Sequence, residues 1–115
     1  MSARLIPTTA CIVALLDHAN GRSDHETAMR LMKVAEELGE ATAAYIGMTG
    51  QNPRKGVTHS REDVAKELVD VIISATIALH GFTDDPAGML DDKLRISEER
   101  LTPAAPAAPG EDDRG

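Results

Sequence analysis

The chain of 115 residues predicts an all-α fold, and three features of the sequence support this prediction. Apolar residues recur every three or four positions over several long stretches, which is the spacing of an amphipathic helix. No stretch rich in β-branched residues alternates for long enough to predict a strand of a sheet. Aromatic side chains are limited to Tyr45 and Phe82, so the core would be aliphatic, as in helical bundles. We therefore expect one four-helix domain over residues 8–101.

The first helix follows a flexible lead-in at residues 1–7 and is expected to end at Asn20, before a glycine. Thr8 or Thr9 would cap its start. Cys11 is the only cysteine, which excludes an internal disulfide, and we interpret it as a small core side chain.

The second helix is expected to start at Ser23 or Asp24 and to run to about Met48, where Thr49 and Gly50 follow. A stripe of residues at helical spacing would form its buried side. This stripe consists of Leu31, Val34, Leu38, Ala41 and Tyr45.

The third helix follows a turn-rich loop at residues 49–59, and Ser60 with Asp63 forms a capping box at its start. Within it, the segment 67–79 is apolar in almost every direction around the helix axis, which predicts a helix buried on most sides. A fourth helix is expected over residues 86–101. The following residues, 102–115, are rich in proline, alanine and acidic residues, which is typical of a disordered tail.

Acidic residues outnumber basic residues by 19 to 12, so the net charge of −7 repels nucleic acid and anionic membranes. No apolar run approaches the roughly 20 residues needed to span a bilayer. We expect a cytoplasmic protein with neither a nucleic-acid partner nor a membrane partner.

Two groups of carboxylates are the main functional candidates. Because a short loop joins the second and third helices, they should form an antiparallel hairpin. Glu40 precedes the loop by about eight residues and Glu67 follows it by about seven, so both lie roughly 10–12 Å from the turn. The hairpin would therefore bring together Glu36, Glu37, Glu40, Glu67 and Asp70. Such an oxygen-rich site suits Mg²⁺ or Mn²⁺, although each acidic group alone is also typical of a solvated helix face.

The segments Glu36-Glu37-Leu38-Gly39-Glu40 and Glu67-Leu68-Val69-Asp70 resemble the E-E-x-x-E and E-x-x-D motifs of the all-α nucleoside triphosphate pyrophosphohydrolases, and among them the MazG-like family. The resemblance implies a four-helix unit that forms homodimers or homotetramers. It also implies Mg²⁺-dependent cleavage of a nucleoside triphosphate between the α- and β-phosphates, which releases a monophosphate and pyrophosphate. The related phosphoribosyl-ATP pyrophosphohydrolases are an alternative within the same class of enzyme.

The motif positions imply roles for individual residues. The resemblance implies that the metal ligands are Glu37, Glu40, Glu67 and Asp70. It also implies that Glu36 is a further ligand or orients the attacking water, so Glu36 and Glu37 would be the catalytic pair.

Side chains that would bind phosphate or substrate are less well defined by the sequence. The candidates are Lys33, Asn52, Arg54, Lys55, Lys93 and Arg100. Lys33 lies one turn before the first motif, where its alternative role is an ion pair with Glu37. Lys93 and Arg100 match a K-x-x-x-N-x-x-R element of the family, except that Ser97 replaces the asparagine.

This departure, with the scarcity of aromatic side chains, leaves two other functions open. One is a non-catalytic helical module that binds a nucleotide or a metal. The other is a purely structural bundle, which would not respond to Mg²⁺.

Overall fold

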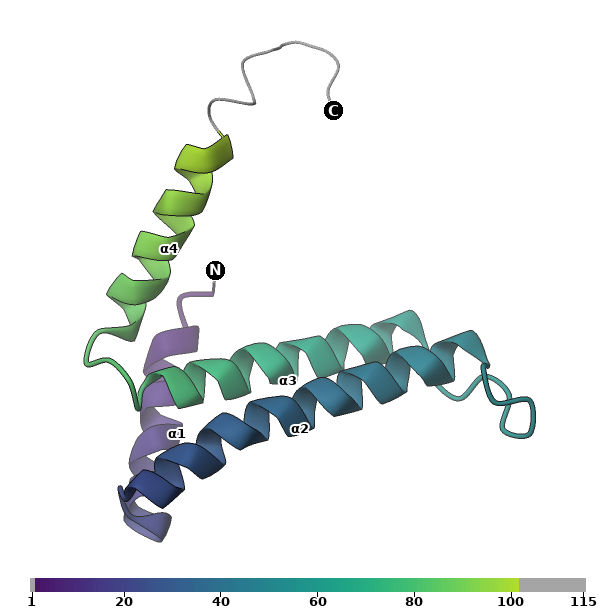
Figure 1. Cartoon of the computed structure of the whole chain (residues 1–115), viewed down its shortest axis with the longest axis horizontal. Helices are drawn as coiled ribbons and strands as arrows, with labels where there is room; N and C mark the ends of the chain where they lie inside the picture. The colour runs from purple at the N-terminus through teal and green to yellow at the C-terminus, as the bar shows by residue number, and fades with distance from the viewer. Residues whose placement is uncertain (1, 102–115) are drawn as a thin grey trace. The chain divides into compact units, whose positions relative to one another are not determined.

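The computed structural model describes residues 2–101. These residues form helices joined by loops and contain no strand (Figure 1). The helices in this range are α1 (Leu5–Asn20), α2 (Asp24–Thr49), α3 (Arg61–Leu79) and α4 (Pro86–Leu101). The all-α class and the four predicted helices are therefore confirmed. The tail predicted at residues 102–115 lies outside the described residues. No helix within the described range is long and apolar enough to cross a membrane.

The chain divides into two compact units. Within the described residues, the first unit extends to residue 84 and contains α1, α2 and α3, whereas the second begins at residue 85 and contains α4. In the first unit, α2 and α3 lie side by side and run in opposite directions, as predicted, with α1 against α3 (Figure 1).

Small side chains fill the seam between α2 and α3. Ala41 and Ala44 of α2 are buried, as are Ser74 and Ala78 of α3. Side chains of this size let the two helix backbones approach closely, which explains how the hairpin can bring its polar groups into contact.

The apolar stripe predicted for α2 is only partly buried, and this corrects the sequence interpretation. Ala41 is buried and Val34 is partly buried, but Leu31, Leu38 and Tyr45 are between 53 and 56% exposed. These three residues are seven positions apart and share one side of the helix, next to the side that α3 covers.

The prediction that α3 is buried on most sides is also wrong for the single chain. Leu68, Val69 and Ile72 are exposed, because no helix of the first unit covers that side of α3. Both helices of the hairpin therefore present apolar side chains to solvent.

Local capping explains where the helices begin and end. The Ser23 hydroxyl accepts a hydrogen bond from the Glu26 amide at the start of α2, and Ser60 and Asp63 form the predicted capping box. Gly50 ends α2 in the left-handed conformation (φ 68°), which favours glycine. The amide of Thr58 then donates to the Gly47 carbonyl, so the loop returns against the end of α2.

The first helix begins three residues earlier than the predicted cap at Thr8, because Pro7 fits within the first turn of a helix. Thr9 is buried inside the helix, and its hydroxyl lies 2.7 Å from the Leu5 carbonyl oxygen and 2.9 Å from His80 Nε2. This hydrogen bond between Thr9 and His80 links the residue that follows α3 to α1.

The prediction that Cys11 is a core residue is wrong. Cys11 is exposed. It lies two positions after the buried Thr9, which places it on nearly the opposite side of α1.

Arg30 joins α1 to α2 through two ion pairs. Its guanidinium lies 3.0 Å from Asp17 of α1 and 2.9 Å from Glu26 of α2, and only 13% of the side chain is exposed. Arg22 also faces Asp17 at 3.6 Å, but its side chain is exposed to solvent. Comparing variants of the two arginines therefore measures how much the ion pairs of Arg30 stabilise the first unit.

We expect Arg30→Met to lower the free energy of unfolding by about 1–2 kcal/mol, because it leaves two carboxylates without their common partner. For a domain of this size the melting temperature would fall by roughly 4–8 °C per kcal/mol. Arg22→Met removes an exposed partner of Asp17 and should change stability by no more than about 0.5 kcal/mol. Equal effects of the two variants in thermal denaturation would show that the ion pairs of Arg30 do not hold α1 in place.

Candidate metal centre

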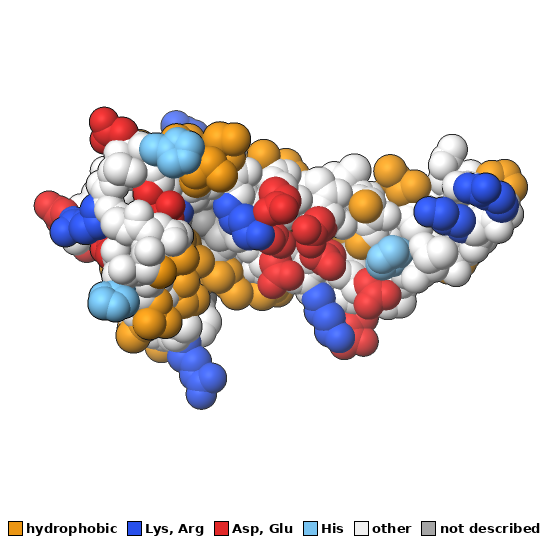
Figure 2. Space-filling model, turned by 90° about the horizontal axis from the view of Figure 1, so that it is seen from below, with side chains coloured by type: hydrophobic (Ala, Val, Ile, Leu, Met, Phe, Trp, Pro, Cys, Tyr) orange, Lys and Arg blue, Asp and Glu red, His pale blue; other side chains and the backbone are white. Residues whose placement is uncertain are grey.

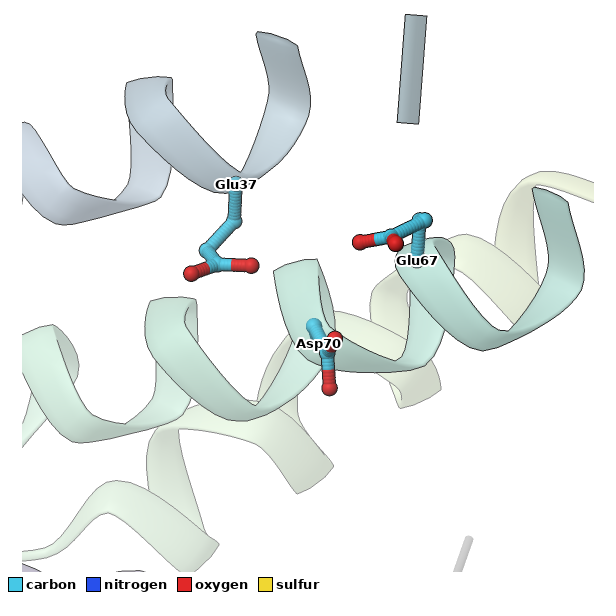
Figure 3. A group of neighbouring side chains, drawn as sticks. All are labelled: Glu37, Glu67 and Asp70. Carbon is cyan, nitrogen blue, oxygen red and sulfur yellow. The ribbon is translucent and has the colours of Figure 1, made fainter. Parts of the chain in front are cut away.

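Three carboxylates meet across the middle of the hairpin. Glu37 extends from α2 toward α3, and Glu67 of α3 points back toward it, with Asp70 one turn further along α3 (Figure 3). One carboxylate oxygen of each residue lies within 4.8 Å of the other two. This group, which we call the acidic triad, joins both halves of the paired motif as the hairpin prediction requires.

The seam partly shields the acidic triad from water. The Glu37 side chain is only 12% exposed, and Glu67 is also partly buried, whereas Asp70 is exposed. Among the described residues, Glu67 Oε1 is the buried side-chain oxygen or nitrogen that has no hydrogen-bond partner. A buried carboxylate oxygen without a donor is costly, so this atom favours a cation as the missing partner.

Glu40 lies in the electrostatic field of the same group, although its oxygens are outside the acidic triad. The negative charge of Glu37, partial desolvation and the charge of Glu67 raise the pKa of Glu40 above its ordinary value. This is the shift expected when like charges face each other without a counter-ion. Acidic side chains accordingly gather on one face of the hairpin (Figure 2).

The donor set fits a hard divalent cation. Mg²⁺ prefers oxygen ligands at about 2.0–2.1 Å, so two ligand oxygens on one ion are at most about 4.2 Å apart. The triad oxygens, within 4.8 Å of one another, are close to this limit and need only small side-chain rotations to meet it. Three carboxylates with a solvent-facing side also leave coordination positions for water or phosphate.

Lys33 is the one predicted cationic residue that the described structure pairs with the motif carboxylates. Its Nζ lies 2.7 Å from Glu36 Oε1 and 3.3 Å from Glu37 Oε2. Glu36 is therefore held by Lys33 at the rim, outside the acidic triad. The hydrogen bonds to Glu36 and Glu37 raise the pKa of Lys33, so it is charged at neutral pH.

Lys33 also lines a mostly apolar pocket of about 360 Å³ beside the carboxylates. Residues from α1, α2 and α3 form the pocket. They are Leu16, Asn20, Glu26, Met29, Arg30, Lys33, Ser74 and Ile77. Sequence reasoning did not identify this pocket, because its residues come from three helices and share no motif spacing.

The other residues predicted to bind phosphate or substrate belong to other segments of the chain. Asn52, Arg54 and Lys55 lie in the loop between α2 and α3, and basic side chains at the loop end of the hairpin are separate from the acidic patch (Figure 2). Lys93 and Arg100 lie on α4, outside the unit that holds the carboxylates.

A larger polar pocket of about 610 Å³ contains none of the motif carboxylates. Its charged residues include Arg30 and Arg22, which pair with Asp17 and, in the case of Arg30, also with Glu26. Because these charges are already paired, the pocket is a weaker candidate for a ligand site than its volume suggests.

Comparisons of the chain with protein-family models, with curated proteins and with solved structures found no match. The candidate site is therefore defined by its residues and their geometry.

Proposed function

We propose that the chain is a MazG-like nucleoside triphosphate pyrophosphohydrolase that depends on Mg²⁺, or on Mn²⁺ in its place. The products would be a nucleoside monophosphate and pyrophosphate. The observation that carries this proposal is the acidic triad, in which Glu37, Glu67 and Asp70 converge at the motif positions around a buried oxygen without a partner. A solvated helix face would not bury such an atom.

In this proposal the acidic triad holds the cation, and Glu40 adds a fourth carboxylate beside it. The bound metal would neutralise phosphate charge and lower the pKa of an attacking water. Glu36, at the exposed rim, would accept a hydrogen bond from that water and orient it toward the α-phosphorus. Glu37 combines two roles, since it would hold the metal and, with Glu36, position the reacting groups.

The pocket of about 360 Å³ would accommodate the nucleoside part of the substrate. Leu16, Met29 and Ile77 offer apolar surface for a base or sugar, and no aromatic side chain lines the pocket. Without an aromatic residue for stacking, recognition of the base would rest on shape and on a few polar groups such as Asn20.

The test is a product assay over canonical and modified nucleoside triphosphates, with Mg²⁺ or Mn²⁺ and without either metal. Phosphate is measured before and after addition of inorganic pyrophosphatase. We expect orthophosphate to be detected only after pyrophosphatase is added, because each turnover would release pyrophosphate. Direct release of orthophosphate would contradict the assigned bond cleavage.

A non-catalytic module that binds a nucleotide or metal is the second candidate. It is favoured by the position of Asn52, Arg54 and Lys55 in the loop between α2 and α3, which leaves Lys33 as the described cation paired with the motif carboxylates. This candidate predicts metal-dependent binding of a triphosphate in calorimetry without any product.

We also propose that the protein forms a homo-oligomer through the apolar side of its hairpin. Leu31, Leu38 and Tyr45 are exposed at a spacing of seven residues, which lets helices of two identical chains pack against each other. Glu36 and Glu40 are each two positions from Leu38, so they lie on nearly the opposite side of α2. A second copy docked on this face would therefore leave these carboxylates accessible.

We expect light scattering to show a dimer or tetramer for the wild type and a monomer for Leu38→Glu, because a charge would be buried at the centre of the interface. Met32→Glu is the control, since Met32 is an exposed residue on another side of the same helix. A monomeric wild type, or dissociation by both variants alike, would contradict this interface.

A further inference from the structure

Lys33 occupies a position between two parts of the proposed active site. Its Nζ contacts Glu37, which belongs to the acidic triad, at 3.3 Å and Glu36 at 2.7 Å. The same side chain lines the mostly apolar pocket of about 360 Å³. Among the described residues, Lys33 is therefore a basic residue that borders both the carboxylates and the pocket.

A divalent cation at the acidic triad and the ammonium of Lys33 require the same carboxylate. Mg²⁺ would lie about 2.0–2.1 Å from an oxygen of Glu37, which places it close to a second positive charge. Like charges at this separation repel each other, most strongly where a carboxylate is partly shielded from water, as Glu37 is. In the free protein Lys33 thus neutralises negative charge on Glu37 that the metal would otherwise neutralise.

The Lys33 side chain has room to move away from Glu37. It is 54% exposed and carries four flexible methylene groups, and the pocket lies directly beside it. A triphosphate whose nucleoside part fills the pocket would present its anionic phosphates between the pocket and the acidic triad. Those phosphates would offer the ammonium a new partner at the same time as the metal removes the old one.

We propose that Lys33 competes with the divalent cation for Glu37 in the free protein and transfers to the substrate phosphates when the cation binds. This inference rests on the proposed function and adds a property to it. Lys33 weakens metal binding in the absence of substrate and strengthens substrate binding in the presence of metal. Metal and nucleotide then bind cooperatively, and the affinity of each rises by the same factor when the other is bound.

The test compares Lys33→Met with Lys66→Met by calorimetry, using Mn²⁺ alone and an α,β-methylene nucleoside triphosphate with and without Mn²⁺. Lys66 is the matched control because it lies on α3 next to Glu67 in the sequence but pairs with Glu62 at 4.0 Å. Both variants remove one positive charge from an exposed side chain. Circular dichroism of both variants checks whether each remains helical.

We expect Lys33→Met to bind Mn²⁺ alone roughly three- to tenfold more tightly than the wild type, and Lys66→Met to change this affinity by about twofold at most. With Mn²⁺ present, Lys33→Met should bind the analogue roughly tenfold more weakly. The factor by which Mn²⁺ promotes binding of the analogue should therefore fall in Lys33→Met and persist in Lys66→Met.

Two results would overturn the inference: equal effects of the two variants, or an affinity of Lys33→Met for Mn²⁺ that is unchanged or weaker. If the wild type binds Mn²⁺ and releases pyrophosphate, either result leaves the enzyme proposal intact. A wild type that neither binds Mn²⁺ nor releases pyrophosphate would overturn both.

Discussion

Asp70→Asn is expected to lower the rate of pyrophosphate release by at least about a hundredfold, because it removes one of the three carboxylates that are proposed to hold the metal. Asparagine keeps the size of the side chain but lacks the negative charge that a divalent cation requires. Since Asp70 is exposed and its neighbours in the acidic triad are other carboxylates, the helices should remain intact. The measurement is initial rates at saturating Mg²⁺, with circular dichroism of the same samples.

Glu62→Gln is the control for Asp70→Asn. Glu62 lies on the same helix, is exposed, and has a single weak ion pair with Lys66 at 4.0 Å. The two variants therefore change the charge of α3 by the same amount, but only Asp70 belongs to the acidic triad. Wild-type rates for Asp70→Asn, or an equal loss in Glu62→Gln, would show that the triad is not the catalytic centre.

Glu67→Gln is expected to change stability in opposite directions with and without metal. In the metal-free protein it should raise the free energy of unfolding by about 1 kcal/mol, because the buried oxygen without a partner belongs to a charged group. The amide of glutamine removes this charge and is able to donate a hydrogen bond to Glu37 or Asp70. Thermal denaturation in EDTA should therefore give a higher melting temperature than that of the wild type.

In the presence of metal the order of the two proteins should reverse. Mg²⁺ at one hundred times its dissociation constant would stabilise the wild type by about 2.7 kcal/mol, which raises the melting temperature by roughly 10–20 °C. Glu67→Gln should lose most of this increase. A metal-free variant less stable than the wild type would indicate that Glu67 has a stabilising partner, and an undiminished response to Mg²⁺ would place the ion elsewhere.

The helices and the meeting of the carboxylates could be predicted from local sequence features. Ser60 and Asp63 mark the start of α3 through side-chain hydrogen bonds within four residues, and such contacts depend little on the rest of the fold. The positions of Glu37 and Glu67 relative to the loop determine their level in an antiparallel hairpin. The convergence of these two residues therefore followed from counting residues on two helices.

Burial could not be predicted in the same way. Periodicity shows that Leu31, Leu38 and Tyr45 share one side of α2, but it does not show which neighbour covers that side. In the structure α3 packs on the adjacent side, where Ala41 and Ala44 allow closer approach. Residue type predicts that large apolar side chains form the core, whereas small side chains form the contact between α2 and α3.

The pocket and the position of Lys33 required the arrangement of three helices. Leu16 and Ile77 are far apart in the sequence, and neither has a chemical property that distinguishes it from a core residue. Lys33 has two plausible partners at helical spacing, and only the structure shows that it contacts both. The sequence therefore predicts the carboxylates of the candidate site more completely than the pocket and the lysine beside them.

The most direct test of the proposed enzyme is ³¹P NMR of a nucleoside triphosphate incubated with Mg²⁺ and either the wild type or Asp70→Asn. For the wild type we expect the triphosphate signals to be replaced by those of a nucleoside monophosphate and pyrophosphate in equal amounts. Asp70→Asn should leave the triphosphate unchanged. Diphosphate and orthophosphate as products, or no reaction by folded wild type with bound metal across the nucleotide panel, would contradict the assignment of this chain as a pyrophosphohydrolase.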